Sequence, residues 1–156
     1  MYTATIATPL GIATISGDAQ GISAITVSDF GEITENIPTD LQDAALQLQE
    51  YFEGKRTEFT FKMNAKGTEF QQKVWKALCE IPFGKTLSYL ELSKKLGDPK
   101  AIRAVASANG KNPLWIVVPC HRVIGSDGSL TGYAGGLRRK EWLLRHENPN
   151  KQQSLF

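Results

Sequence analysis

Residues 88–110 have the sequence SYLELSKKLGDPKAIRAVASANG and predict two short helices joined by a tight turn. Ser88 and Glu91 have the spacing of a capping box, in which Ser88 bonds the backbone N–H of Glu91 and Glu91 reaches back to Ser88. The second helix is expected to begin at Asp98 as its N-cap, with Pro99 in its first turn. Two short helices connected in this way predict a helix-turn-helix.

The second helix of this pair has an unusual exposed face. Ile102, Val105 and Ala106 are predicted on its buried side, and only small side chains surround Arg103 on the other side. Such a face lets the backbone approach a nucleic-acid groove closely while one guanidinium projects into it. An alanine-rich helix packed against a neighbour has the same pattern, so both interpretations stay open on this evidence. The exposed residues are expected to be Lys100, Arg103, Ala104 and Ser107.

The sequence outside this pair predicts an α+β (α/β) fold. Residues 1–30 alternate β-branched and apolar residues with turn signals, which is typical of a small antiparallel sheet. A helical period follows from Asp40 to a stop at Gly54, and residues 55–66 look like one more short strand and a linker. We therefore expect a sheet-and-helix support domain over residues 1–65, a mostly helical domain with the helix-turn-helix over residues 66–149, and a polar tail over residues 150–156.

The charge of the chain is divided unevenly along its length. Residues 1–65 hold three basic and nine acidic residues, net −6, whereas residues 66–156 hold fifteen basic and seven acidic residues, net +8. A basic part beside an acidic part is expected when one face of a protein meets a polyanion such as DNA. Solvated lysines remain the alternative, because charge alone does not decide between the two.

Composition argues against several other classes of protein. No stretch of about 18 apolar residues is present, so no membrane span is expected. The first residues lack the basic start and apolar core of a signal peptide, so the protein is expected to stay in the cytoplasm, where it is made. Two cysteines and two histidines, poorly spaced, predict no metal site. We expect no cofactor, and the absence of an oligomerisation signal favours a monomer.

A cysteine and a histidine are adjacent after a short apolar segment. Residues 116–118 look like a strand that Pro119 interrupts, and Cys120 and His121 follow directly. Neighbouring side chains diverge in both strands and helices, so contact between these two requires a turn or an intervening water. An imidazole base raises the thiolate fraction of a cysteine that attacks as a nucleophile, and an orienting carboxylate would complete the set.

The sequence around Cys120 resembles a known family. Pro119-Cys120-His121-Arg122 is followed by glycines at 125, 128, 132, 135 and 136 and then by a helix that ends in His146-Glu147. This segment resembles the 6-O-alkylguanine-DNA alkyltransferases, whose signature is Pro-Cys-His-Arg. The match covers residues 68–147 without a gap in register, and it includes Val74-Trp75, Ile81-Pro82, Ser88-Tyr89, Arg103-Ala104-Val105 and Asn112-Pro113. Residues 1–65 match only in general plan.

The resemblance implies a reaction and a role for each catalytic residue. Cys120 is the alkyl acceptor, His121 is its base through a bridging water, and Glu147 orients His121. Tyr133 donates to the guanine ring and helps the leaving base accept a proton. Displacement at the alkyl carbon gives a thioether that water does not readily cleave, so each molecule reacts once. No second thiol resolves the product, because Cys79, on the apolar helix, has no redox spacing to Cys120.

The same resemblance implies double-stranded DNA with an alkylated base as the partner, and a base that is flipped into a pocket. Arg103 fills the vacated stack, Tyr89 pushes on the adjacent phosphate, and Asn112 braces the helix-turn-helix against the reactive segment. Ala134 replaces a serine of many relatives and Trp115 replaces a proline, which leaves open the alkyl range and the repair of 4-O-methylthymine. The expected DNA contacts are Tyr89, Lys100, Arg103, Ala104, Ser107 and Arg122. The expected pocket residues are Asn112, Trp115, Val118, Tyr133, Ala134 and Gly135.

Three other classes compete with this interpretation: a helix-turn-helix regulator, a non-catalytic sensor of alkylation damage with the same fold, and a cysteine hydrolase. A regulator has no use for the Cys-His-Glu set, and sensor relatives usually replace the reactive cysteine, commonly with tryptophan. A hydrolase turns over repeatedly. Stoichiometric transfer of an alkyl label to Cys120 distinguishes the alkyltransferase from all three.

The tail suggests a second partner. Residues 152–156, QQSLF, look like the short peptides by which bacterial DNA-processing proteins dock on the polymerase sliding clamp. The alternative is that Leu155 and Phe156 pack on their own surface. A tail peptide titrated against purified clamp is expected to bind more tightly than the same peptide carrying Leu155→Ala and Phe156→Ala. Equal weak binding by both peptides would remove this hypothesis.

Overall fold

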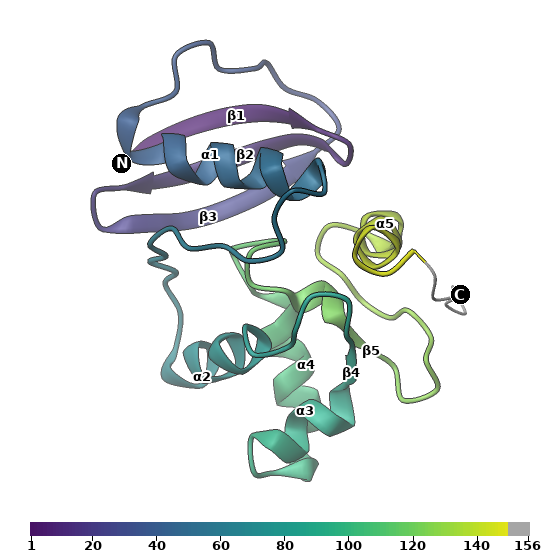
Figure 1. Cartoon of the computed structure of the whole chain (residues 1–156). Coiled ribbons are helices and arrows are strands. Elements are labelled where there is room, and N and C mark those ends of the chain that lie inside the picture. The colour runs from purple at the N-terminus through teal and green to yellow at the C-terminus, as the bar shows by residue number, and fades with distance from the viewer. Residues whose placement is uncertain (150–156) are drawn as a thin grey trace. The chain divides into compact units, whose positions relative to one another are not determined.

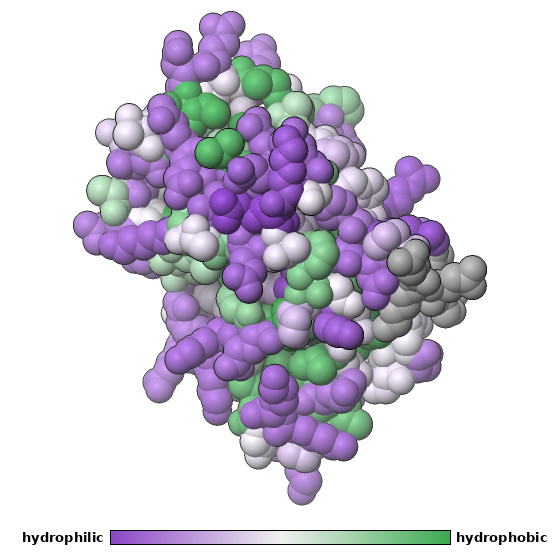
Figure 2. Space-filling model, in the orientation of Figure 1, coloured by the Kyte–Doolittle hydropathy of each residue, from purple (hydrophilic) through white to green (hydrophobic). Residues whose placement is uncertain are grey.

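The computed structural model describes residues 1–149 and divides the chain into two compact units. The first unit contains Met1–Lys66 together with Pro113–Trp115, and the second contains Gly67–Asn112 and the chain from Ile116 onward. The clamp-like residues 152–156 lie outside the described part of the chain. No helix among the described residues is long and apolar enough to cross a membrane. Figure 2 shows hydrophilic residues over most of the face that it draws, with hydrophobic residues in small separate patches.

The first unit is built on a three-stranded antiparallel sheet in the order β1-β2-β3, as the sequence predicts. Its strands are β1 (Tyr2–Thr8), β2 (Gly11–Asp18) and β3 (Gly21–Ser28), and α1 (Thr39–Phe52) packs against them. Alternation along the strands places Ile6, Ile15 and Ile25 in the core, where Leu41 and Leu48 of α1 are also fully buried. Burial of these aliphatic side chains is the main stabilising contribution in this unit.

Two separate segments, and not the extra strand expected within residues 55–66, occupy the outer edge of β3. Ile22 donates its N–H to Lys62 O at 2.9 Å and accepts from Asn64 N at 2.7 Å. Ile25 donates to Pro113 O at 2.8 Å and accepts from Trp115 N at 3.0 Å. Each segment contributes a single parallel bridge, at Met63 and at Leu114. Because the two segments share one edge, neither extends into a strand, and the prediction of a strand in residues 55–66 was wrong.

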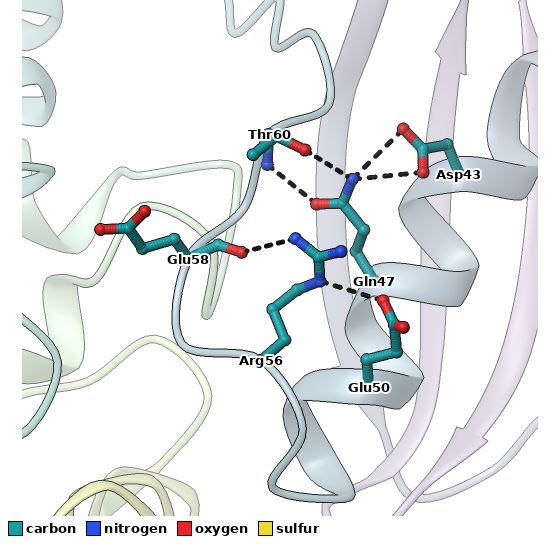
Figure 3. A network of polar contacts seen from close by, with 6 residues as sticks. All are labelled: Asp43, Gln47, Glu50, Arg56, Glu58 and Thr60. Carbon is teal, nitrogen blue, oxygen red and sulfur yellow. Dashed lines mark hydrogen bonds and ion pairs between the residues drawn. The ribbon is translucent and has the colours of Figure 1, made fainter.

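A polar network attaches the segment after α1 to that helix (Figure 3). The buried Gln47 donates from Nε2 to Thr60 Oγ1 at 2.9 Å and accepts from Thr60 N at 2.8 Å. Its Nε2 also lies 3.2 Å from both carboxylate oxygens of Asp43. Arg56 donates to Glu50 Oε1 and to a main-chain carbonyl, that of Glu58, each at 3.0 Å. Gln47 therefore satisfies a backbone N–H that would otherwise lose its partner.

The second unit begins with a helix that has a complete capping box. In α2 (Glu69–Leu78) the N-cap Thr68 accepts from Gln71 N, and the Gln71 side chain accepts from Thr68 N. Trp75 donates from Nε1 to Ala108 O at 2.8 Å, which joins α2 to α4 (Ile102–Gly110). The indole of Trp75, which is buried and also donates this hydrogen bond, therefore fixes the position of α4, the helix that carries the expected DNA-binding face.

The helix-turn-helix consists of α3 (Tyr89–Lys95) and α4, with the short helix η1 (Pro99–Ala101) leading into α4. The predicted capping box is present, since Ser88 accepts from Glu91 N at 3.0 Å and Glu91 accepts from Ser88 N at 2.9 Å. Asp98 caps η1 and not α4, by accepting from Lys100 N at 2.9 Å. Strand β4 (Leu87–Ser88) pairs in parallel with β5 (Val123–Ile124), and α5 (Leu137–Glu147) follows.

Residues 116–118 do not form the short strand that their apolar sequence predicts. They lie in a turn in which Ile116 has a φ of 75°, although all three side chains are buried. The chain pairs with Ile25 through residues 113–115 and re-enters the second unit at Ile116. A reversal at that point excludes an extended conformation, and a positive φ in a β-branched residue marks local strain.

We expect Gln47→Leu to lower the free energy of unfolding by about 1–3 kcal/mol, because it removes the two hydrogen bonds that the buried Gln47 side chain makes with Thr60, each contributing about 0.5–1.5 kcal/mol. Urea denaturation followed by far-UV circular dichroism measures the change. The matched control is Gln49→Leu in the same helix, where the side chain is exposed, and its effect should stay within about 0.5 kcal/mol. Equal effects of the two substitutions would show that the network does not stabilise the unit.

Candidate active site

Cys120 begins the short helix η2 (Cys120–Arg122) and is 3% exposed. The preceding Pro119 has φ −81° and ψ 62°, and Cys120 N donates to Val118 O at 2.8 Å. These values describe an inverse γ-turn, which is the break at Pro119 that the sequence predicts. Asn112 stabilises the turn by donating from Nδ2 to Val118 O at 2.9 Å. Both Asn112 and Val118 are buried beside the reactive segment.

His121 is completely buried and contacts the carboxylate expected for it. Its Nε2 lies 2.8 Å from Glu147 Oε2, near the end of α5. Burial lowers the pKa of His121 below its ordinary value, although Glu147 raises it. An ionised carboxylate only accepts hydrogen bonds, so Nε2 carries the proton and Nδ1 carries the lone pair of the neutral ring. Nδ1 is buried and has no hydrogen-bond partner among the described residues.

Glu147 is also paired with Arg122. The guanidinium donates from Nε to Glu147 Oε1 at 2.7 Å, from Nη2 to Oε2 at 2.9 Å and from Nη1 to Ile81 O at 2.6 Å. Burial raises the pKa of Glu147, but the hydrogen bonds and charges of His121 and Arg122 outweigh it and hold that pKa well below the ordinary range. This carboxylate therefore stays ionised beside the imidazole.

The position of Arg122 differs from the DNA contact that the sequence predicts. Its side chain is buried, and its charge is used by Glu147 and by the carbonyl of Ile81. The Phe83 ring lies 5.8 Å from the guanidinium carbon as a further contact. A guanidinium held in this way is not available to a phosphate, so the structure corrects that expectation.

Lys140 belongs to the site although sequence reasoning missed it. The side chain is fully buried, and Nζ donates to Val123 O at 2.6 Å, to Thr131 O at 2.8 Å and to Gly132 O at 3.3 Å. Burial lowers its pKa to about 8. The helical spacing of the sequence could have indicated its burial, because Lys140 shares the buried face of α5 with Leu143, Leu144 and Glu147.

The thiol of Cys120 rests in its neutral form. Burial raises the pKa of Cys120 above its ordinary value, while a hydrogen bond from Asn112 and the charge of Lys140 lower it. Burial also raises the pKa of Tyr133 well above its ordinary value, so its hydroxyl keeps its proton. The site thus contains a neutral thiol, a neutral imidazole and a protonated hydroxyl.

A cavity of about 540 Å³ opens within the second unit. This volume lies in the range of small-molecule sites, about 300–1,000 Å³. Four expected site residues line it, namely Tyr89, Arg103, Tyr133 and Ala134. Further lining residues are Ile102, Ala106, Asn109, Gly110, Thr131 and Gly132.

Several residues are not where the sequence predicts them. Asn112, Val118 and Gly135 are buried and are not among the described residues that line the cavity, and Trp115 belongs to the first unit. Ile102 and Ala106 were expected on the buried side of the helix, but both are half-buried at the cavity wall. Cys79 is the C-cap of α2 and is exposed, not part of an apolar face.

The exposed face of α4 matches the prediction. Lys100, Arg103, Ala104 and Ser107 are all exposed, while Val105 on the opposite side is fully buried. Helix α4 therefore presents small side chains and the exposed Arg103 next to the cavity, which Arg103 helps to line. Within the described residues, no group of three or more His, Cys, Asp or Glu side chains could hold a metal ion.

Asn109 is a second residue that sequence reasoning missed. It is 3% exposed, lines the cavity, and donates from Nδ2 to Cys120 O at a long 3.5 Å. Asn109 follows the buried Val105 by four residues, so the helical period places it on the buried face of α4. A polar residue at such a position could have indicated a functional role from the sequence.

Comparisons with known proteins agree over the whole described chain. Residues 69–149 match the family model of the 6-O-methylguanine DNA methyltransferase DNA binding domain, and residues 1–65 match that of its ribonuclease-like domain. A methylated-DNA–protein-cysteine methyltransferase of Methanosarcina barkeri is 46% identical, with 96% of this chain and 99% of that protein covered. A relative with the same description in Mycolicibacterium paratuberculosis is 45% identical, with 97% and 94% covered.

A solved structure is similar in both sequence and fold. The crystal structure of Mycobacterium tuberculosis OGT in complex with DNA has a TM-score of 0.87 and 44% identity, and covers 96% of this chain and 94% of that one. The chain therefore belongs to the 6-O-methylguanine DNA methyltransferase family, and it repairs alkylated guanine in DNA by transferring the alkyl group to a cysteine of its own.

Proposed function

We propose that Cys120 is the cysteine that accepts the alkyl group, with His121 as its base and Glu147 as the residue that orients the base. The observation that carries this assignment is the pairing of His121 Nε2 with Glu147, which leaves the unprotonated Nδ1 of a buried imidazole for the neighbouring thiol. A bridging water transfers the thiol proton to Nδ1.

The reaction is a single displacement at the alkyl carbon. The sulfur of Cys120 forms a bond to that carbon, and the bond from the carbon to the guanine oxygen breaks. The electron pair of the broken bond leaves with the guanine, which takes up a proton with the Tyr133 hydroxyl as its donor. Tyr133 regains a proton as His121 gives up the one taken from the thiol, either directly or through solvent, so that charge and protons balance. The thioether is stable to water, and each molecule therefore reacts once.

The cavity is proposed as the place where the flipped base is held. Its walls carry Tyr89 and Tyr133, and the exposed Arg103 stands at the same wall on the face of α4. Extruding a base costs only a few kcal/mol, and least for a damaged pair. Arg103 offsets this cost by filling the vacated stack, and Tyr89 contacts the adjacent phosphate. Lys100 and Ser107 contact phosphates in double-stranded DNA, which gives affinity without sequence preference.

We expect labelled methyl groups on 6-O-methylguanine in duplex DNA to move stoichiometrically to Cys120. Peptide mapping by mass spectrometry after one turnover identifies the modified residue. Cys120→Ala should abolish transfer, whereas the matched Cys79→Ala, which removes the other free thiol, should leave the rate unchanged. Label on Cys79, repeated turnover, or transfer that survives Cys120→Ala would contradict the assignment.

Arg103→Ala is expected to slow repair in duplex DNA by about tenfold or more, the effect of about 1.4 kcal/mol of lost flipping free energy. The same variant should react normally with free 6-O-methylguanine, since no stack has to be opened. Arg138→Ala is the matched control, because Arg138 is exposed on α5 and does not line the cavity. Equal losses with duplex and with free base would remove the flipping role of Arg103.

A further inference from the structure

We propose that Asn109 is a positioning residue for the transfer, because its side-chain amide joins the hydroxyl of Tyr89 to the main-chain oxygen of Cys120. The inference rests on the proposed function, in which Tyr89 contacts the DNA and Cys120 accepts the alkyl group. Asn109 lies on α4, is 3% exposed and donates from Nδ2 to Cys120 O at 3.5 Å. Its side chain also shares a hydrogen bond with the side chain of Tyr89, on α3. One amide therefore contacts both the DNA-contacting tyrosine and the reactive segment.

The directions of these hydrogen bonds follow from the atoms involved. Tyr89 donates its single hydroxyl hydrogen to Thr131 O at 3.4 Å, so the phenolic oxygen is left to accept from Asn109. The amide nitrogen of Asn109 carries two hydrogens, one for Tyr89 and one for Cys120 O. A reversed amide would place two acceptors against each other at Cys120 O. Burial raises the pKa of Tyr89, so its hydroxyl keeps the proton that it donates.

The main-chain oxygen of Cys120 does not need Asn109 to be satisfied. It already accepts from Val123 N at the end of η2. An apolar side chain in place of Asn109 would leave this local hydrogen bond intact, so the turn at the reactive segment does not require the amide. The bond from Asn109 is a second one to the same carbonyl, and it adds a connection from α4 and Tyr89 to the reactive segment.

The Tyr89 side chain is also connected to α5. Thr131 O, which accepts from Tyr89, accepts from Lys140 Nζ at 2.8 Å as well, and that nitrogen lies 6.0 Å from the centre of the Tyr89 ring. Asn109 connects this group of contacts to Cys120. A displacement reaction slows steeply when the reacting atoms are misplaced by about 1 Å. Loss of the Asn109 amide should therefore slow transfer although every reacting group is still present.

The test is a double-mutant cycle on the rate constant of single-turnover transfer from 6-O-methylguanine in duplex DNA. Asn109→Leu, which keeps the size of the side chain but cannot donate a hydrogen bond, should slow transfer by about tenfold or more. In the Tyr89→Phe background the same substitution should slow transfer by about threefold at most, because the hydroxyl that Asn109 holds is already absent. Label should still reach Cys120 in every variant.

The matched control is Ser93→Ala in the same cycle. Ser93 is buried on α3 and donates from its hydroxyl to the main-chain oxygen of Tyr89 at 2.8 Å. This substitution disturbs the backbone of Tyr89 but not its hydroxyl, so it should change the rate by the same factor with and without Tyr89→Phe. Affinity for undamaged duplex DNA, measured by fluorescence anisotropy, should be retained in Asn109→Leu and shows that the helix-turn-helix is folded.

A normal transfer rate in Asn109→Leu would overturn the inference, and so would equal slowing in the two backgrounds. Ser93→Ala with the same dependence on the Tyr89 hydroxyl would also overturn it, because the cycle would then report a general disturbance of α3. Asn109→Ala should repeat the pattern of Asn109→Leu, and it decides the question if Asn109→Leu does not fold. Failure of the unmodified protein to label Cys120 would instead contradict the proposed function.

Discussion

The carboxylate of Glu147, which is buried inside the second unit, accepts hydrogen bonds from both His121 and Arg122. Removing one partner of a buried ion pair costs far more than the pair contributes, because it leaves an uncompensated charge. The end of α5 is therefore fixed to the reactive segment through two consecutive residues. The bond from Arg122 to Ile81 O extends this attachment to the residues that follow α2.

This shared carboxylate also keeps one negative charge inside a site where burial disfavours charged groups. Burial opposes every charge near Cys120: it raises the pKa of the thiol and lowers those of His121 and Lys140. The bidentate guanidinium keeps Glu147 ionised, which fixes the tautomer of His121 with its basic nitrogen free. Arg122 thus positions the carboxylate that contacts His121. The arginine of the Pro-Cys-His-Arg sequence stabilises the site from inside, although sequence reasoning placed it on the DNA surface.

Local signals predicted the parts of this protein that depend on neighbours in sequence. The capping box of Ser88 and Glu91, the turn at Pro119 and the exposed face around Arg103 each follow from the properties of a few consecutive residues, and the structure confirms them. The roles of Arg122, Lys140 and Asn109 depend on carbonyls and carboxylates far away in sequence, which no local pattern specifies. For the same reason the pairing of residues 113–115 with Ile25 could not be predicted.

The buried polar groups around Cys120 differ in how many of their hydrogen bonds are made within the protein. Lys140 has three carbonyl acceptors and Arg122 has two partners, so these side chains hold the site together at rest. His121 Nδ1 and Asn109 Oδ1 are the two buried side-chain atoms without a hydrogen-bond partner of their own among the described residues, and Asn109 lines the cavity. Folding alone gains nothing from an unpaired buried acceptor, since each one weakens the folded state. The unpaired Nδ1 of His121 is accounted for if, under the proposed function, it takes up the proton of Cys120 during repair.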